Sequence, residues 1–434
     1  MPQPEGLVLV FLASEPKMIA SALNLLKHTQ FPVWILSFYT FIWFLQIGNR
    51  INILGTIRIE FIVGSALVAL SLIAWANQKK CQDFFHHGFV RSIYFLYIFF
   101  IVYTIFSYNP EASSAVFVDR ILKFSMFTLF IGTLVKNKYD VAIILLGFFL
   151  AMGKIIQEGV HGIVTGGMIW ENQGIPRLHG VTLLYRHPNS LSGLAVSALP
   201  FFLFLYRFQT KVLKYVFIGC IIGLLAIVLY TGSRTGYVAT LILATAVVMR
   251  LGLFKLKNIL ALAVLIPVIF MIIPQDYKNR FNTMFQSEEE RGSSVNKRIE
   301  ILEDAWEIAK KYPLGVGVQA FPHIREIEFS RTQDTHNLYL EILTNLGPFG
   351  LLAFVIFIAM LFKTNRLSRA IHIRKKNHFL AEVCYIVNLY VLCRLALGMF
   401  GMDLYEVYWW FAAGFTIALA KLAVTGYTET LPKA

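Results

Sequence analysis

The chain has 434 residues, of which 57% are hydrophobic and 15% are aromatic, and its mean hydropathy is +0.63. These values lie well above those of a soluble domain and indicate a polytopic helical membrane protein. The formal net charge is +14, but the cations gather in alternate loops, so the charge does not indicate a nucleic acid partner. The four cysteines lie in a basic loop or in apolar segments and indicate neither a disulfide framework nor a metal site.

Apolar runs near the length needed to cross about 30 Å of hydrocarbon recur along the whole chain. Hydropathy predicts an all-α fold with about twelve membrane-spanning helices. We divide the chain into spans 1–9 (residues 1–273), a loop subdomain (residues 274–335) and spans 10–12 (residues 336–434). The predicted spans are 31–48, 56–76, 92–108, 118–135, 140–156, 187–206, 211–230, 233–250, 256–273, 336–362, 379–399 and 405–425.

The loops indicate the topology. With both termini in the cytoplasm, the inner loops carry most of the lysines and arginines, as the positive-inside rule requires. The most basic loop follows span 10, and the outer loops hold far fewer cations. Two predicted outer loops are long, at residues 157–186 and 274–335, and the second is the candidate for a small extramembrane subdomain.

Three arginines lie where this topology predicts few cations. Arg177, Arg186 and Arg234 all fall in outer loops close to the starts of apolar helices. Arg234 follows Ser233, which is a plausible N-cap for span 8. A cation in the first turn of a helix opposes the helix dipole. The functional interpretation is a set of ligands for an anion at the membrane surface, and the alternative is arginines that snorkel to lipid phosphates.

Three predicted helix starts face the same side. Pro188 suits the first position of span 6, which places Arg186, His187 and Asn189 around its outer end. Asp334 or Thr335 can cap span 10, which places His336 and Asn337 in its first turn. Spans 6, 8 and 10 therefore point their N-termini outward. Together with the nearby arginines and histidines, they would form a site for a phosphate or diphosphate if they are adjacent.

The second long outer loop contains an amphipathic helix that we expect to begin at Arg298. Apolar residues from Ile301 to Ala309 form one face, and Asp304 is among the charged residues of the other. Trp306 is interpreted as a packing or interfacial anchor in preference to a sugar-stacking group. Arg298 is either a further anion ligand or a solvated surface residue.

The protonation of His336 depends on opposing effects. A helix N-terminus and neighbouring arginines disfavour the imidazolium, whereas a carboxylate such as Asp334 favours it. If the positive groups prevail, the imidazole is neutral near pH 7 and can act as a general base.

The segments RLHGVTLLYRHPNSLSG, YTGSRTGYVATLILA, NKRIEILEDAWEIAKKYPLGVGVQAF and DTHNLYLEILTNLGPFGLLAF resemble the O-antigen ligase and polymerase superfamily. In that family an outer loop carries an arginine, an aromatic residue one turn later, a Pro-x-Gly-x-Gly element and a His-Asn pair. Arg298, residues 313–317, His336 and Asn337 fit this pattern. The aromatic position is Leu302 here, and Trp306 follows one turn later.

The resemblance implies a glycosyltransferase of the bacterial inner membrane with a GT-C-like fold, which acts at the periplasmic face without a metal or other cofactor. The donor would be a glycan on undecaprenyl diphosphate, and the acceptor a sugar hydroxyl of lipid A–core oligosaccharide. The implied roles are general base for His336, diphosphate binding for Arg177, Arg186, Arg234 and Arg298, and support for His187 and Asn337.

Other functions remain open at this level. An O-antigen polymerase or a protein O-oligosaccharyltransferase would use the same carrier and the same motifs. A transporter or flippase for a lipid-linked glycan is an alternative of another class, because about twelve spans are common in transporters. Transporter sites usually lie at the midplane in broken helices, whereas the unusual polar residues of this chain gather at one face. The isolated outer acids Asp403 and Glu406 are expected to be structural.

Overall fold

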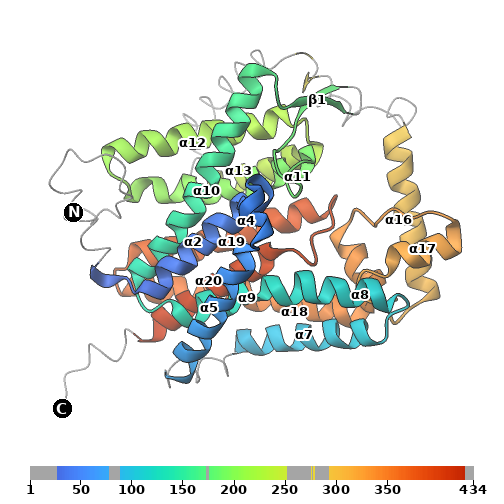
Figure 1. Ribbon diagram of the computed structural model, residues 1–434, viewed down its shortest axis with the longest axis horizontal. Coiled ribbons are helices and arrows are strands. Elements are labelled where there is room, and N and C mark those ends of the chain that lie inside the picture. Colours follow the sequence, from blue (N-terminus) through green and yellow to red (C-terminus); the bar gives the residue numbers. More distant parts are fainter. Residues whose placement is uncertain are drawn as a thin grey trace.

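The computed structural model describes residues 27–77, 88–172, 175–251, 275, 277–278 and 293–425. Within these ranges the chain is almost entirely helical, and the two strands form one short hairpin (Figure 1). The first half contains α2 (Phe31–Leu45), α3 (Ile47–Arg50), α4 (Asn52–Thr56), α5 (Ile59–Ala76), α7 (Gly88–Ile105), α8 (Pro110–Val116), the π-helical turn η1 (Phe117–Leu122), α9 (Lys123–Leu134), α10 (Lys138–Thr165), β1 (Ile169–Asn172) and β2 (Ile175–Leu178). The second half contains α11 (Pro188–Leu205), the 3-10 turn η2 (Tyr206–Phe208), α12 (Lys211–Tyr230), α13 (Arg234–Leu251), α16 (Ser293–Lys311), α17 (Phe321–Phe329), α18 (Leu338–Arg374), α19 (His378–Gly398) and α20 (Val407–Thr425).

Eight of the described helices are long and apolar enough to cross a membrane, and the all-α polytopic fold class is confirmed. Each of the eight coincides with a predicted span. Of the other four predicted spans, 31–48 corresponds to the shorter apolar helix α2, and 118–135 to the helical stretch that η1 interrupts before α9. Span 233–250 corresponds to α13, and span 256–273 lies outside the described residues. The eight helices are Ile59–Ala76, Gly88–Ile105, Lys138–Thr165, Pro188–Phe208, Lys211–Tyr230, Leu338–Arg374, His378–Gly398 and Val407–Val424.

Close helix packing builds the bundle. A Cβ atom on Gly147 of α10 would lie 2.1 Å from the carbonyl oxygen of Ser37 in α2, so these helices touch through their backbones. Small residues allow such approaches between membrane helices, where van der Waals contact drives association. One continuous apolar core of buried residues, rich in phenylalanine, extends through the bundle.

Several of the loops predicted to be on the outer side lie together, on the right-hand side of Figure 1, where α8, α16 and α17 gather. The Tyr108 N–H donates to the Val316 carbonyl at 3.0 Å, and the Gln319 N–H donates to the Tyr405 hydroxyl at 3.2 Å. Helix α16 lies across this end, beside α17. Loops that are far apart in the sequence therefore form one surface.

The first long outer loop is shorter than predicted. Helix α10 continues to Thr165, so the helix extends past the predicted start of the loop at residue 157. The remainder forms an antiparallel hairpin in which Trp170 pairs with Arg177. The added turns pack closely on other segments, which hydropathy alone does not register: a Cβ atom on Gly159 would lie 2.7 Å from the side chain of Ile227 in α12, and one on Gly162 would lie 2.6 Å from that of Met168.

The Pro-x-Gly-x-Gly element (residues 313–317) forms hydrogen bonds with the backbone of α18 where that helix is broken, at Gly347 and Pro348. Pro348 lacks an N–H group and therefore cannot donate to the Thr344 carbonyl one turn earlier. The Val316 N–H donates to that carbonyl at 2.8 Å, and the Gly317 N–H donates to the Asn345 carbonyl at 2.9 Å. Gly315 and Gly317 have φ of +90° and +112°, which favours glycine. The element thus supplies the donors that the broken helix lacks.

Helices α16 and α17 enclose a small apolar core of their own, separate from that of the bundle. Helix α16 begins at Ser293 and not at Arg298, so the predicted start was five residues late. Val295 is the one apolar residue of the helix before Arg298, so most of the apolar face that marks the helix lies beyond Arg298. Arg298 is consequently beyond the first helical turn and is not opposed by the dipole as strongly as expected. The core consists of Ala305, Ile308, Val316, Ala320, Phe321 and Ile324.

Candidate active site

Arg177 joins two of the three predicted helix starts. It lies on β2 with 1% of its surface exposed. Its Nε donates to the Thr231 carbonyl at 2.7 Å, just before α13, and its Nη2 donates to Asn189 Oδ1 at 2.7 Å, in the first turn of α11. Gly236 of α13 in turn packs on α11, because a Cβ atom there would lie 2.0 Å from Ser192 Oγ. The starts of spans 6 and 8 are therefore adjacent.

Both helix starts agree with the prediction, which was Ser233 as the cap of span 8 and Pro188 as the first residue of span 6. Ser233 Oγ accepts a hydrogen bond from the Gly236 N–H at 3.2 Å, and Arg234 is the first residue of α13. Pro188 is the first residue of α11, and His187 Nδ1 accepts from the Asn189 N–H at 3.2 Å. A nitrogen that accepts must carry a lone pair, so this bond selects the His187 tautomer with its proton on Nε2.

The start of α18 differs from the prediction. The N-cap is Asn337 and neither Asp334 nor Thr335, so His336 precedes the helix and does not lie in its first turn. Asn337 Oδ1 accepts from the N–H groups of Tyr339 and Leu340, both at 3.0 Å. Asp334 is engaged elsewhere, since its Oδ2 accepts from Gln319 Nε2 at 2.7 Å. Asparagine is as good an N-cap as aspartate. Because Asp334 is bound to Gln319, Asn337 caps α18 instead.

His336 adopts a left-handed backbone conformation with φ of +48°. This conformation is uncommon for residues other than glycine, although histidine adopts it more often than most. The neighbouring Asn337 holds the segment in place, because its Nδ2 donates to the Met399 carbonyl at 3.0 Å. Such outliers cluster at functional sites, where the surrounding structure enforces them.

The outer end of α19 bridges the start of α18 to that of α11. A Cβ atom on Gly398 would lie 2.7 Å from the side chain of Leu338, the first residue of α18. A Cβ atom on Gly193 of α11 would lie 3.4 Å from Arg394 and 3.5 Å from Leu397. The starts of α18 and α11 therefore both pack on the outer end of α19, and the start of α13 is adjacent to that of α11.

Electrostatic interactions show that the motif residues share this surface. Burial lowers the pKa of His187 below its ordinary value of 6.5, and the charges of Arg177, His336 and Arg298 lower it further. Burial also lowers the pKa of His336, followed by Arg298 and Arg325, while Asp334 acts in the opposite direction. The two arginines together outweigh Asp334 in their effect on the pKa of His336, so the pKa is lowered, which favours the neutral imidazole. Arg298 acts on both histidines although it comes from a different element.

Arg298 has no carboxylate partner among the residues that the structure describes. Its side chain is partly buried, and burial lowers its pKa. A partly desolvated cation without a counter-ion is electrostatically costly, and a bound anion would relieve that cost.

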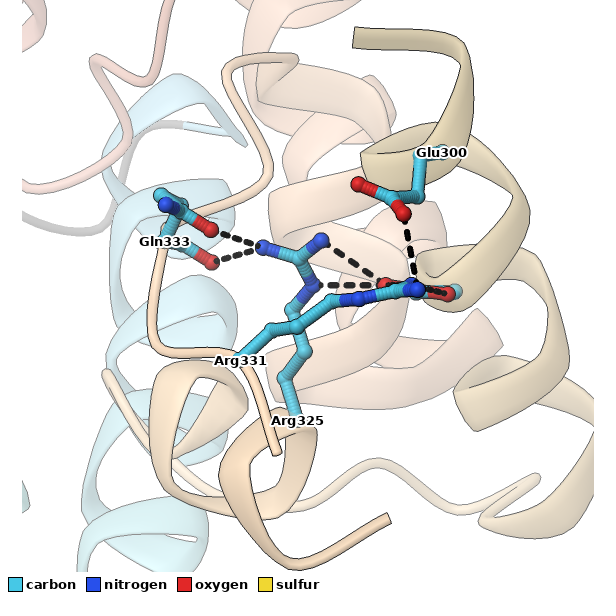
Figure 2. A network of polar contacts seen from close by, with 5 residues as sticks. Glu300, Arg325, Arg331 and Gln333 are labelled. Carbon is cyan, nitrogen blue, oxygen red and sulfur yellow. Dashed lines mark hydrogen bonds and ion pairs between the residues drawn. The ribbon is translucent and has the colours of Figure 1, made fainter. Parts of the chain in front are cut away.

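A buried ionic network holds α16 against the segment that carries His336 (Figure 2). Arg325 of α17 is 0% exposed, and its Nε donates to Asp304 Oδ2 of α16 at 2.9 Å. Its Nη1 donates to the side chain of Gln333 at 2.9 Å. Arg331 joins the network through Asp304 at 3.0 Å and Glu300 at 2.7 Å. The network positions Arg298 relative to His336.

Asp304 was placed on the charged face of the helix, yet it is buried, with only 5% of its surface exposed. Sequence reasoning missed the roles of both Asp304 and Arg325. The partner of Asp304 lies 21 residues along the chain on another helix, so helical periodicity carries no signal for it. On the same helix, Leu302 and Trp306 are 38% and 52% exposed.

Arg186 is exposed, and its guanidinium lies 6.0 Å from the centre of the Trp170 ring in the hairpin. The ring of Trp170 also stacks on that of His179, with 4.5 Å between their centres. The hairpin therefore carries Arg186 on its outer side and Arg177 on its buried side.

The outer acids are paired with arginines. Asp403 forms an ion pair with Arg394, and Glu406 forms one with Arg120 at 2.9 Å. These pairs agree with the structural role expected for both acids. Within the described ranges, no group of three His, Cys, Asp or Glu residues is arranged to hold a metal ion.

A comparison with known protein families supports the resemblance that the motifs indicate. The model of the O-antigen ligase family matches residues 219–355, a range that includes Arg234, Arg298, His336 and Asn337. The predicted resemblance to the O-antigen ligase and polymerase superfamily is thereby confirmed. No curated protein matches the chain significantly.

Proposed function

We propose that this member of the O-antigen ligase and polymerase superfamily is an O-antigen ligase. It transfers a glycan from undecaprenyl diphosphate to a sugar hydroxyl of lipid A–core oligosaccharide. We place the reaction at the periplasmic face of the bacterial inner membrane, with both termini in the cytoplasm. The family match supports the general class, a transferase that uses a lipid-linked glycan.

His336 is the proposed general base. The acceptor hydroxyl gives its proton to an imidazole nitrogen of His336 as its oxygen attacks the anomeric carbon of the donor. The bond from that carbon to the diphosphate oxygen breaks, and the configuration inverts. A lowered pKa keeps the imidazole unprotonated at neutral pH, which is the state that a base requires.

The arginines stabilise the leaving lipid diphosphate, whose negative charge rises as the glycosidic bond breaks. Arg298, Arg234 and Arg186 are the proposed direct ligands. Arg177 is a proposed positioning residue, since it is buried and donates to Thr231 and Asn189, although its charge still reaches His187. The N–H groups at the starts of α11 and α13 add positive potential.

One observation carries the proposal. Arg298 of α16 acts on the protonation of both His187 and His336, so motif residues from three separate elements meet at one surface. An arginine that no described carboxylate pairs with, beside a neutral histidine, matches the requirements of inverting transfer from a diphosphate.

The test uses purified protein with carrier-linked glycan and lipid A–core. We expect His336→Ala to lower the transfer rate by about 100-fold or more, the usual contribution of a positioned base. Arg234→Ala is expected to reduce transfer as well. The control is His323→Ala, which removes a histidine of α17. Near wild-type ligation by both the His336 and Arg234 variants would refute these assignments.

Two further arms separate the alternatives. Supplying the donor without lipid A–core distinguishes the branches of the family, because a polymerase would still lengthen the glycan. Supplying a protein acceptor tests a protein O-oligosaccharyltransferase. A transporter or flippase should tolerate the loss of His336, so transport of the donor by His336→Ala without any transfer by the wild type would favour that class.

A further inference from the structure

A second cluster of arginines lies at the opposite end of the bundle from the candidate active site. Arg207 follows α11, Arg250 ends α13, and Arg369 lies near the end of α18. Glu382, in the first turns of α19, is 3% exposed and lies among them. Four helix ends thus converge on one buried carboxylate.

The carboxylate does not balance the arginines. Glu382 Oε2 accepts from Arg250 at 2.8 Å and also forms an ion pair with Arg207. Arg369 has no ion pair among the residues that the structure describes, but it lies within electrostatic reach of both Arg207 and Arg250. In the described part of the chain, three positive charges therefore face one negative charge at this site.

Hydrogen-bonding capacity is also left unused. Arg250 Nη1, Arg369 Nε and Glu382 Oε1 are buried and have no hydrogen-bond partner within the described ranges. A buried donor or acceptor without a partner costs about 1–3 kcal/mol. Each such group requires an explanation, and a bound molecule that completes the site is one.

An aromatic side chain holds the guanidinium groups in place. Arg250 lies 3.8 Å and Arg369 lies 5.6 Å from the centre of the Tyr385 ring. Arg250 also lies 4.8 Å from the ring centre of Phe204. Stacked arginines lose little freedom on binding and suit planar recognition of phosphate. Arg207, whose side chain is 55% exposed, provides the open side of the cluster.

Membrane topology alone does not account for this arrangement. The positive-inside rule requires cations in the loops but does not require them to converge on a buried carboxylate. Basic pockets between membrane helices on the cytoplasmic side bind the phosphates of anionic lipid head groups. This end of the bundle is also the predicted cytoplasmic end.

We propose that Arg207, Arg250 and Arg369 form a binding site for the phosphate of an anionic phospholipid. The phosphate accepts from the unused guanidinium N–H groups, and the unpaired Glu382 oxygen accepts from a head-group hydroxyl. The lipid joins α11, α13, α18 and α19 at the end far from the active site.

The test uses purified, delipidated protein in detergent, with native mass spectrometry and thermal unfolding as readouts. Phosphatidylglycerol should bind and raise the unfolding temperature more than phosphatidylcholine does. Arg369→Gln should weaken the apparent affinity for phosphatidylglycerol about tenfold, as expected for the loss of a charged hydrogen bond. The matched control is Arg366→Gln, which removes the same charge from an exposed position of α18 and should bind normally.

A second variant covers the case in which Arg369→Gln does not fold. Arg207→Gln alters the exposed side of the cluster and should also weaken binding. Equal phosphatidylglycerol binding by the wild type and the folded cluster variants would overturn the proposal. Equal binding of the two lipids by the wild type, or stabilisation by inorganic phosphate alone, would overturn the assignment to an anionic lipid.

Discussion

The loop between spans 9 and 10 contains two arginines whose surroundings are opposite. Arg325 is fully buried, and its guanidinium is matched by Asp304 and Gln333. Arg298 is partly buried, and no carboxylate in the described chain pairs with it. A cation that the protein itself neutralises holds the structure together. A cation that is left without a counter-ion is available to a ligand, and this difference separates scaffold from site.

The largest effect on stability should come from Arg325→Gln. Removing one partner of a buried ion pair leaves the other uncompensated and costs about 3–5 kcal/mol. We expect a lower unfolding temperature in detergent and a loss of transfer that follows the loss of folded protein. Arg331→Gln is the control, since its side chain is 38% exposed and its contribution should be smaller. Equal unfolding temperatures for both variants would contradict the structural role of Arg325.

Arg298→Gln should have the reverse signature. We expect the transfer rate to fall about 100-fold, the usual loss when one stabilising donor is removed from a site of developing negative charge. The unfolding temperature should stay unchanged or rise, because no ion pair is broken. Lys297→Gln makes the same charge change at the neighbouring exposed position and should leave transfer intact. A fall in stability without a specific loss of transfer would place Arg298 in the scaffold.

The pH dependence of transfer should follow the charges around His336. Its pKa lies below the ordinary value of 6.5, so the base form persists below that pH and activity falls only when the pH drops through the lowered value. Arg298→Gln should raise the pKa and move the acidic limb of the profile to higher pH. Asp334→Asn removes the opposing charge and should move it to lower pH. Shifts of the same sign in both variants would refute this assignment of the limb.

The smallest expected effect is that of Asn337→Ala. Loss of the N-cap costs about 1 kcal/mol, and the released segment should lower transfer modestly by freeing His336. Asn337→Asp keeps an oxygen that can cap α18 but loses the donor to Met399. It should therefore recover stability but not the full transfer rate. If Asn337→Asp recovers neither stability nor the transfer rate, capping α18 is not the main role of this residue.

Local patterns were sufficient for much of the fold. Apolar runs predicted the membrane helices because burial in hydrocarbon demands continuous hydrophobic segments. Ser233 and Pro188 marked the starts of α13 and α11 because capping depends on neighbouring residues only. The end of α10 was misplaced because its last turns pack on distant segments, which local hydropathy does not record, and the start of α16 was misplaced because its first turn is mostly polar.

The composition, the topology and the motif residues were thus accessible from the chain alone, because each depends on local chemistry. Three features required the tertiary structure: Arg177 tying two helix starts together, Arg325 pairing with Asp304, and Arg298 having no carboxylate partner among the described residues. Each of these three features depends on an arginine. Which arginines are neutralised by the protein and which are left for a ligand depends on contacts between distant segments, which no local pattern records.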